Sequence, residues 1–180
     1  MKFIGDYIKF LHYYDSPLGK IILASDGENL LACCLPTSKY PNKSVFADKE
    51  QKLLPVFEDS MRWLDIYFAG EKPDSLPKIK FIGSDFQISV WKILKEIPYG
   101  KIVTYKDIAK RIAENRGIKK MSAQAVGGAV GHNPINIIIP CHRVVGTNHS
   151  LVGYGGGINI KSYLLKMEGV DIEKYTIPKM

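Results

Sequence analysis

The spacing of apolar residues changes once along this chain, and that change limits the folds it can adopt. In the first part, residues 21–23 and 30–35 are short apolar runs on either side of Asp26-Gly27, a pair typical of tight turns. After residue 85, apolar residues recur at intervals of three and four, as they do in residues 86–97. A chain that begins with paired strands and continues with amphipathic helices is predicted to have an α+β fold.

The first part also contains a third strand and a helix. Residues 7–19 are rich in aromatic and branched side chains and are predicted to join the hairpin in a small antiparallel sheet. Residues 53–68 have helical apolar spacing, and Gly70 ends the predicted helix. Residues 71–85 contain two prolines and are predicted to be a linker or an edge strand. We therefore predict an N-terminal α/β domain at 1–85 and a C-terminal domain at 86–180.

The second part is predicted to be mainly helical. Its first helix covers residues 86–97, and a second follows Thr104, a residue type that favours helix N-caps. Ser122 is the expected N-cap of a third helix, and a last helix ends at Gly169. Short helices joined by tight turns indicate a helix-turn-helix.

Composition excludes several classes of protein. The 180 residues are 46% hydrophobic and 24% charged, which is ordinary for a globular chain, and no apolar run is long enough for a membrane span. The N-terminus lacks the pattern of a signal peptide. Three cysteines without framework spacing argue against a disulfide scaffold and favour a reducing compartment. We expect an intracellular protein.

The excess of positive charge lies entirely in the second part. Residues 1–85 carry 11 Lys and Arg against 12 Asp and Glu, whereas residues 86–180 carry 14 against 6. This asymmetry suggests a polyanionic partner, and a solvated basic surface explains it equally well. The predicted helix "AQAVGGAVG" consists mostly of Ala and Gly, which allow another backbone to approach closely. That neighbour could be a helix or a nucleic acid, and the basic helix-turn-helix favours nucleic acid.

The segment "IIIPCHRVV" places Cys141 beside His142 and Arg143, directly after Pro140. A lone cysteine is more often a buried, inert residue, but cationic neighbours favour the nucleophilic thiolate. Residues 137–139 are predicted to be a buried, strand-like run. On an extended backbone Cys141 and His142 would point to opposite faces, so a direct pair needs a turn or a bridging water. The sequence leaves both possibilities open. The loop "GYGGG", residues 153–157, could expose backbone N–H groups or form a mobile lid.

These segments together resemble one known family. "NPINIIIPCHRVVG", "GYGGG" and "KSYLLKMEG" are similar to the O6-alkylguanine-DNA alkyltransferases, also called methylated-DNA–protein-cysteine methyltransferases. The similarity covers at least residues 86–174, and "YYDSPLGKIILASDGENL" resembles the family's N-terminal pattern. The resemblance implies an N-terminal α/β domain with an antiparallel sheet and a C-terminal helical domain with a winged helix-turn-helix. It also implies binding in the DNA minor groove, flipping of the damaged base, and transfer of its alkyl group to a cysteine, once per molecule.

The resemblance further implies a role for each matching residue. Cys141 would accept the alkyl group, His142 would draw the thiol proton through a water, Glu168 would orient His142, and Asn133 would brace the turn. Tyr105 would lie at the flipped nucleotide and its phosphate. The other substrate- and DNA-binding residues implied are Gln124, Ala125, Gly128, Arg143, Tyr154, Gly155 and Lys161.

The expected partner is double-stranded DNA containing O6-alkylguanine, with O4-alkylthymine as a second substrate. We expect no metal, because Cys33, Cys34 and His12 lack ligand spacing. We also expect no cofactor and no membrane contact. The protein should be a cytoplasmic monomer, associated with the nucleoid when bound to DNA.

The sequence departs from the family pattern at several positions, and two other functions remain open. Gln124 stands where the family commonly has Arg, and Gly155 where Ser or Ala is usual. A non-enzymatic lesion-binding protein of the same fold is one alternative, although such relatives lack the cysteine. A cysteine hydrolase using Cys141, His142 and Glu168 is the other. It would turn over, and it would leave the small-residue helix and the basic domain unexplained.

Overall fold

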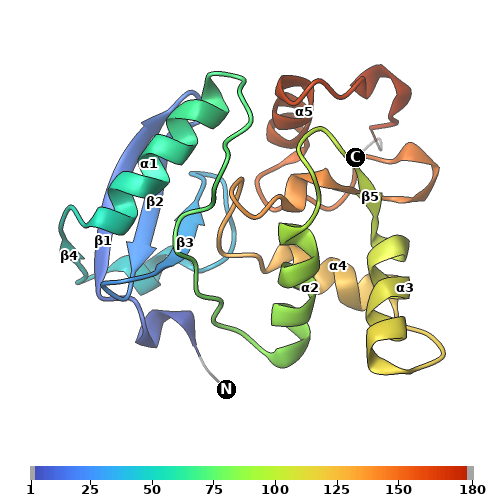
Figure 1. Cartoon of the computed structure of the whole chain (residues 1–180), viewed down its shortest axis with the longest axis horizontal. Helices are drawn as coiled ribbons and strands as arrows, with labels where there is room; N and C mark the ends of the chain where they lie inside the picture. The colour runs from blue at the N-terminus through green and yellow to red at the C-terminus, as the bar shows by residue number, and fades with distance from the viewer. Residues whose placement is uncertain (1–2, 178–180) are drawn as a thin grey trace. The chain divides into compact units, whose positions relative to one another are not determined.

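The computed structural model describes residues 3–177, and its chain forms two compact units (Figure 1). The first unit extends to Ser84 and also contains Pro134–Ile138. The second unit contains Asp85–Asn133 and the residues from Ile139 onward. Residues 134–138 lie in the predicted C-terminal domain, so their membership of the first unit is a departure from the boundary drawn from the sequence. None of the helices in residues 3–177 has the length and apolar character needed to cross a membrane.

The first unit is built on a four-stranded sheet in the order β3-β2-β1-β4. Strands β1 (Phe10–Ser16), β2 (Gly19–Ser25) and β3 (Leu30–Cys34) are antiparallel neighbours, which confirms the predicted hairpin and the strand before it. Strand β4 (Glu50–Gln51) pairs with β1 in parallel. The sheet was predicted to be antiparallel, and this one pairing departs from the prediction. Strand β4 consists of only two polar residues, so it lacks the alternation of apolar and polar residues by which a strand is predicted from sequence.

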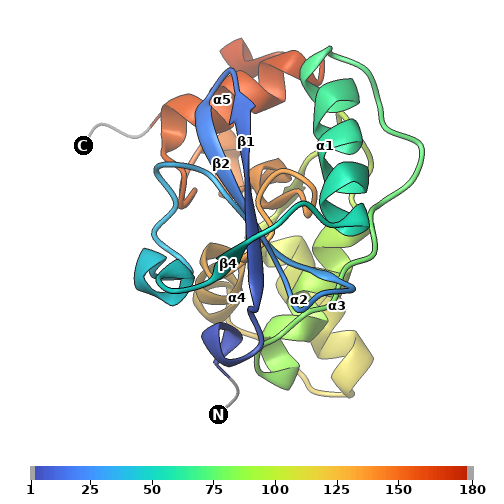
Figure 2. The same cartoon turned by 90° about the vertical axis from the view of Figure 1, so that its left-hand side faces the viewer.

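Helix α1 (Pro55–Phe68) contacts β1 and β3 and lies along the sheet (Figures 1 and 2). It begins at Pro55 rather than at residue 53, because proline fits the first turn of a helix, where no N–H partner is needed. Two short 3-10 helices, η1 (Ile4–Asp6) and η2 (Lys43–Phe46), contact each other. The apolar core of this unit includes Ile4, Ile8, Leu11, Ala24, Leu31, Ala32, Cys34, Phe46 and Ile82.

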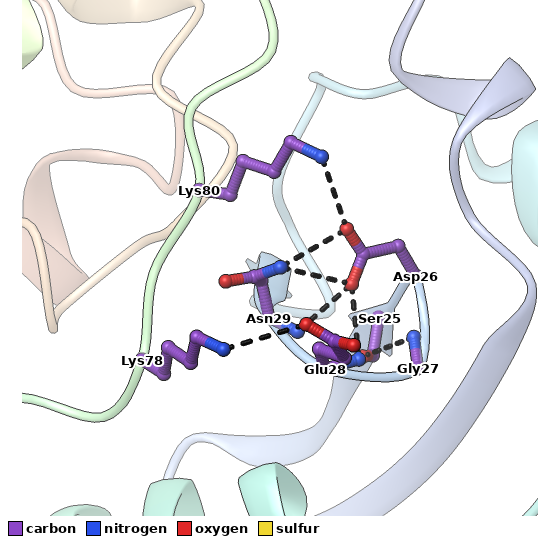
Figure 3. Close-up of polar contacts among 7 residues, drawn as sticks. All are labelled: Ser25, Asp26, Gly27, Glu28, Asn29, Lys78 and Lys80. Carbon is purple, nitrogen blue, oxygen red and sulfur yellow. Dashed lines mark hydrogen bonds and ion pairs between the residues drawn. The ribbon is translucent and has the colours of Figure 1, made fainter.

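The turn between β2 and β3 is fastened by side chains from a later segment (Figure 3). The Asp26 carboxylate accepts hydrogen bonds from the backbone N–H groups of Glu28, at 3.1 Å, and Asn29, at 2.8 Å. Lys80 pairs with Asp26 at 3.3 Å, and Lys78 pairs with Glu28 at 3.4 Å. Burial alone would raise the pKa of Asp26, but these hydrogen bonds and Lys80 hold it below its usual value.

Two distant segments cover the outer edge of β3. Leu30 donates its N–H to the Lys78 carbonyl at 2.7 Å, so residues 71–85 behave as a linker that touches the sheet edge. Farther along, the Cys33 N–H donates to the Pro134 carbonyl at 2.9 Å, and the Asn136 N–H donates to the Cys33 carbonyl at 2.8 Å. An uncovered edge would invite pairing with another chain, and these bonds close it.

The second unit is mainly helical, as predicted. Its longer helices are α2 (Asp85–Lys95), α3 (Tyr105–Arg116), α4 (Ala123–Gly131) and α5 (Ile158–Met167). Strands β5 (Val103–Thr104) and β6 (Val144–Val145) pair in parallel. The 3-10 helices are η3 (Cys141–Arg143), η4 (Thr147–His149) and η5 (Ile172–Lys174).

Helices α3 and α4 pack against each other and against α2, which forms the predicted helix-turn-helix. Thr104 caps α3 through a reciprocal pair of bonds with Asp107, and Gly117 ends the helix in the left-handed conformation. Ser122 caps α4 by accepting the Ala125 N–H at 3.3 Å. The indole N–H of Trp91 in α2 donates to the Ala129 carbonyl at 2.8 Å and fixes α4 on its buried side.

Candidate active site

Cys141 lies on a tight turn. Pro140 has φ −82° and ψ 64°, and the Cys141 N–H donates to the Ile139 carbonyl at 2.8 Å, which is an inverse γ-turn. Cys141 and His142 then follow each other in the 3-10 helix η3, so they do not alternate across a strand. The strand predicted for residues 137–139 is wrong. These residues are buried as expected, but Ile137 has φ 68° at the centre of a second tight turn, closed by a 2.8 Å bond from Ile138 to Asn136.

Asn133 braces this turn. Its side-chain amide donates to the Ile139 carbonyl at 2.9 Å, which joins the two points where the chain leaves and re-enters the second unit. The same side chain hydrogen-bonds the Cys141 thiol. A buried amide therefore supports the turn that carries Cys141.

A buried ion-pair network lies directly beside Cys141. His142 Nε2 is 2.6 Å from Glu168 Oε1, and neither side chain is exposed to solvent. Arg143 donates to the same carboxylate from Nε at 2.8 Å and from Nη2 at 3.0 Å. The Gly100 N–H adds a bond to Glu168 at 3.0 Å, and Arg143 Nη1 donates to the Ile97 carbonyl at 2.6 Å. Glu168 thus accepts three hydrogen bonds from two residues, Arg143 and Gly100, and holds His142 in turn.

Arg143 was expected among the DNA-binding residues, and the structure places it elsewhere. Only 7% of the residue is exposed, and its guanidinium is engaged by Glu168 and Ile97. Its role in the site is to support Glu168. The sequence held no signal for this pair, because the two residues are 25 positions apart.

The environment sets the charge of each group. Burial raises the pKa of the Cys141 thiol, although Asn133 and Lys161 oppose the shift, so the resting residue is a thiol. Burial lowers the pKa of His142, against the pull of Glu168, and keeps its ring neutral near pH 7. Burial alone would raise the pKa of Glu168, but His142 and Arg143 hold it well below its usual value. A neutral imidazole backed by a carboxylate beside a thiol is an arrangement that activates a nucleophile.

Lys161 and Tyr105 hold the loop that follows Gly146. Lys161 is fully buried and donates to the carbonyls of Val144 and Val152, the latter at 2.7 Å. Tyr105 donates its hydroxyl to the carbonyls of Val152, at 3.2 Å, and Gly153, at 3.1 Å. Burial lowers the pKa of Lys161 to about 8 and raises the pKa of Tyr105. Lys161, expected to bind substrate or DNA, is instead a buried support of the loop.

Helix α4 has one buried face and one exposed face. Val126, Ala129 and Val130 are buried, whereas Gln124, Ala125 and Gly128 are exposed. A side chain at Gly128 would meet nothing within 4 Å, but one at Gly127 would lie 3.8 Å from the Tyr105 ring. An added Cβ would be accommodated at both glycines, so the packing of α4 against α2 and α3 does not require them, and what the small residues do is keep the exposed face of α4 free of bulky side chains.

The glycine-rich loop brings a second aromatic ring to the site. The Tyr154 ring lies edge-on to His142, with centroids 6.5 Å apart. Gly155 faces the Gly131 carbonyl, which would be 3.9 Å from an added Cβ, an ordinary contact. The serine or alanine usual at this position would therefore fit.

The described residues offer no cluster of three or more His, Cys, Asp or Glu side chains placed to hold a metal ion. Cys33, Cys34 and Cys141 form no disulfide. Cys33 and Cys34 are buried in the sheet, and burial raises the pKa of Cys34 to about 12, so these two thiols are inert packing residues.

Comparison with known proteins identifies the family. Residues 9–77 match the ribonuclease-like domain of 6-O-methylguanine DNA methyltransferase, and residues 85–170 match the DNA binding domain of the same family. The chain is 43% identical over 156 residues to the methylated-DNA–protein-cysteine methyltransferase of Methanosarcina acetivorans, with 87% of this chain and 96% of that protein covered. The chain belongs to the 6-O-methylguanine DNA methyltransferase family. The resemblance found in the sequence is confirmed.

Other members of the methyltransferase family agree. The protein of the same name from Haemophilus influenzae is 40% identical, over 88% of this chain and 85% of its own length. Among solved structures, the Mycobacterium tuberculosis OGT in complex with DNA superposes with a TM-score of 0.77 at 37% identity, covering 92% of this chain and 98% of that one. The family fold, an N-terminal sheet domain and a helical C-terminal domain, is the one predicted.

Proposed function

We propose that this chain repairs O6-alkylguanine in double-stranded DNA by moving the alkyl group to its own Cys141, once per molecule. The observation that carries the proposal is the 2.6 Å contact between His142 and Glu168 beside the buried Cys141, within the part that matches the family's DNA binding domain. Relatives over most of the chain are named methylated-DNA–protein-cysteine methyltransferases, which is the same reaction.

The first step removes the thiol proton from Cys141. His142 uses Nε2 for Glu168, so its other ring nitrogen, Nδ1, receives the proton through a bridging water. The neutral ring is able to accept this proton, because burial lowers the pKa of His142. Glu168 remains anionic and stabilises the imidazolium that forms.

The second step is an in-line displacement at carbon. The Cys141 thiolate attacks the alkyl carbon, an S–C bond forms as the C–O6 bond breaks, and the electron pair of that bond passes to the guanine. The guanine takes up one proton and leaves as the neutral base. That proton is the one His142 took from Cys141, which returns through the bridging water, so His142 is neutral again after transfer and the proton count balances. The thioether that results is not cleaved again, so each molecule acts once.

DNA is engaged by the exposed face of α4. Gln124, Ala125 and Gly128 enter the minor groove, and the damaged base is flipped into the pocket at Cys141 beside Tyr154 and Gly155. Gln124 fills the space left by the base through hydrogen bonds rather than charge. O4-alkylthymine presents a similar alkylated oxygen and is a second substrate. The protein acts as a monomer in the cytoplasm, on the nucleoid when bound to DNA.

The test is the stoichiometry of repair. The protein is mixed with a tenfold excess of a duplex that carries one O6-methylguanine, and restored guanine is counted against protein. Product formation should stop at one equivalent, and Cys141→Ala should form none. Product that accumulates well beyond one equivalent would overturn the proposal in favour of a hydrolase, and no product from the wild-type chain would overturn it in favour of lesion binding alone.

A further inference from the structure

Helix α4 carries no charge on the face proposed to meet DNA. Its nine residues, "AQAVGGAVG", include neither an acidic nor a basic side chain, and its exposed positions include Gln124, Ala125 and Gly128. Contacts between cationic side chains and phosphates supply most of the affinity of a protein for DNA. The cations that hold α4 on DNA must therefore come from neighbouring segments of the same unit.

A groove of about 910 Å³ adjoins the start of α4. One face of α3, residues 118–122 of the turn between the helices, and Ala123 at the beginning of α4 form its walls. Ala109, Ala113 and Ile118 give it an apolar floor. Four exposed lysines line it, namely Lys106, Lys110, Lys119 and Lys120.

The two carboxylates in the groove are already engaged. Asp107 is bound by the backbone N–H and the hydroxyl of Thr104, at 2.8 and 2.7 Å, in the cap of α3. Glu114 lies 4.0 Å from Lys110. In the described part of the chain, residues 3–177, no carboxylate lies within 4.0 Å of the ammonium groups of Lys106, Lys119 or Lys120. The groove is therefore open, positively charged, and supplied with three lysines that have no internal ion pair.

We propose that this groove binds the sugar–phosphate backbone of the DNA strand that flanks the flipped base. The inference rests on the proposed function and adds the residues that position α4. Lys119 and Lys120 immediately precede Met121 and the N-cap Ser122, so phosphates held there fix where α4 enters the minor groove. The apolar floor suits the sugars, and the lysines on both walls suit the phosphates between them.

The test is the salt dependence of DNA binding. The variant Lys119→Gln/Lys120→Gln is compared with the wild-type chain on a duplex carrying one O6-methylguanine, with Cys141→Ala in both so that binding is not obscured by transfer. Each phosphate contact contributes about 0.9 to the slope of log K against log salt, so the slope should fall by about 1.8. The ratio of the wild-type to the variant binding constant should then fall by about 12-fold between 50 and 200 mM salt.

A matched variant controls for charge alone. Lys166→Gln/Lys174→Gln removes two exposed lysines from α5 and η5, which lie at the other end of this unit from the α3–α4 turn (Figures 1 and 2). Its slope should match that of the wild type. An unchanged slope in Lys119→Gln/Lys120→Gln, or an equal fall in both variants, would overturn the groove proposal.

The free base O6-methylguanine separates this proposal from the proposed function, because it needs Cys141 but offers no phosphate. With Cys141 intact, Lys119→Gln/Lys120→Gln should take the methyl group from the free base at the wild-type rate. If the wild-type chain takes it from neither the base nor the duplex, the proposed function fails. If the double variant also loses transfer from the free base, Lys119→Gln and Lys120→Gln are tested one at a time. Each single variant should lower the slope of log K against log salt by about 0.9, and an unchanged slope in both would overturn the groove proposal.

Discussion

Replacing Glu168 with Gln tests the buried network that the site depends on. The Glu168 carboxylate faces His142 at 2.6 Å and receives two bonds from Arg143, at 2.8 and 3.0 Å. Only 6% of Glu168 and 7% of Arg143 are exposed. Glu168→Gln keeps the shape of the side chain but leaves the Arg143 guanidinium buried without a counter-charge.

The expected cost follows from that burial. Removing one partner of a buried ion pair typically destabilises a protein by about 3 to 5 kcal/mol, because the remaining charge cannot reach water. Arg143→Met should cost a similar amount for the same reason. The double variant removes both charges, so no unpaired charge remains buried. Its loss in free energy of unfolding should therefore be about 2 kcal/mol smaller than the sum of the losses in the two single variants.

Urea unfolding at pH 7 measures these free energies, with single-turnover transfer measured on the same samples. Asp171→Asn is the matched control, because it breaks the exposed Lys174–Asp171 pair, at 3.1 Å in the same unit, and should change stability by less than about 1 kcal/mol. Glu168→Gln should also slow transfer, since His142 loses its orienting partner. Losses at Glu168 and Arg143 that simply add, or that resemble the Asp171→Asn control, would refute the reasoning.

Three further predictions concern other parts of the second unit. Because burial lowers the pKa of Lys161 to about 8 from 10.5, the folded chain binds fewer protons than the unfolded chain between these values. The stability of the wild type relative to Lys161→Met should therefore rise by about 3 kcal/mol from pH 8 to 10.5, as measured by urea unfolding across that range. Gly153 has φ +70°, and a Cβ there would lie 2.6 Å from the Tyr105 hydroxyl, so Gly153→Ala should cost about 1 to 3 kcal/mol in thermal unfolding and slow transfer from DNA. Thr104→Ala removes the cap of α3 and should cost about 1 kcal/mol in the same unfolding assay while leaving free-base transfer unchanged.

The features that could be predicted from the sequence are set by neighbours along the chain. Asp26-Gly27 forms its turn with residues two and three positions away, and the Thr104 hydroxyl caps α3 through Asp107, three positions on. The Ser122 cap is equally local. Interactions of this range depend little on the rest of the fold, so residue type and spacing are enough to find them.

The features that were missed depend on residues far apart in the sequence. Arg143 meets Glu168 only because η3 contacts α5, and the sequence suggested for Arg143 only a cationic neighbour of Cys141 and a DNA-binding residue. Residues 134–138 join the first unit through Cys33, about 100 positions earlier, and this pairing accompanies the tight turn at Ile137 where a strand was expected. A run of isoleucines indicates burial, but it does not distinguish a strand from a buried turn.

The central claim is that the alkyl group moves to Cys141, and the most direct test is to measure the mass of the protein after the reaction. The protein is incubated with a duplex carrying one O6-methylguanine, and intact mass is followed by a peptide map. The account predicts a gain of one CH₂ on the peptide that contains Cys141, none on the peptides of Cys33 or Cys34, and none in Cys141→Ala. An unmodified Cys141 after the guanine has been restored, or a methyl group found on another residue, would contradict it.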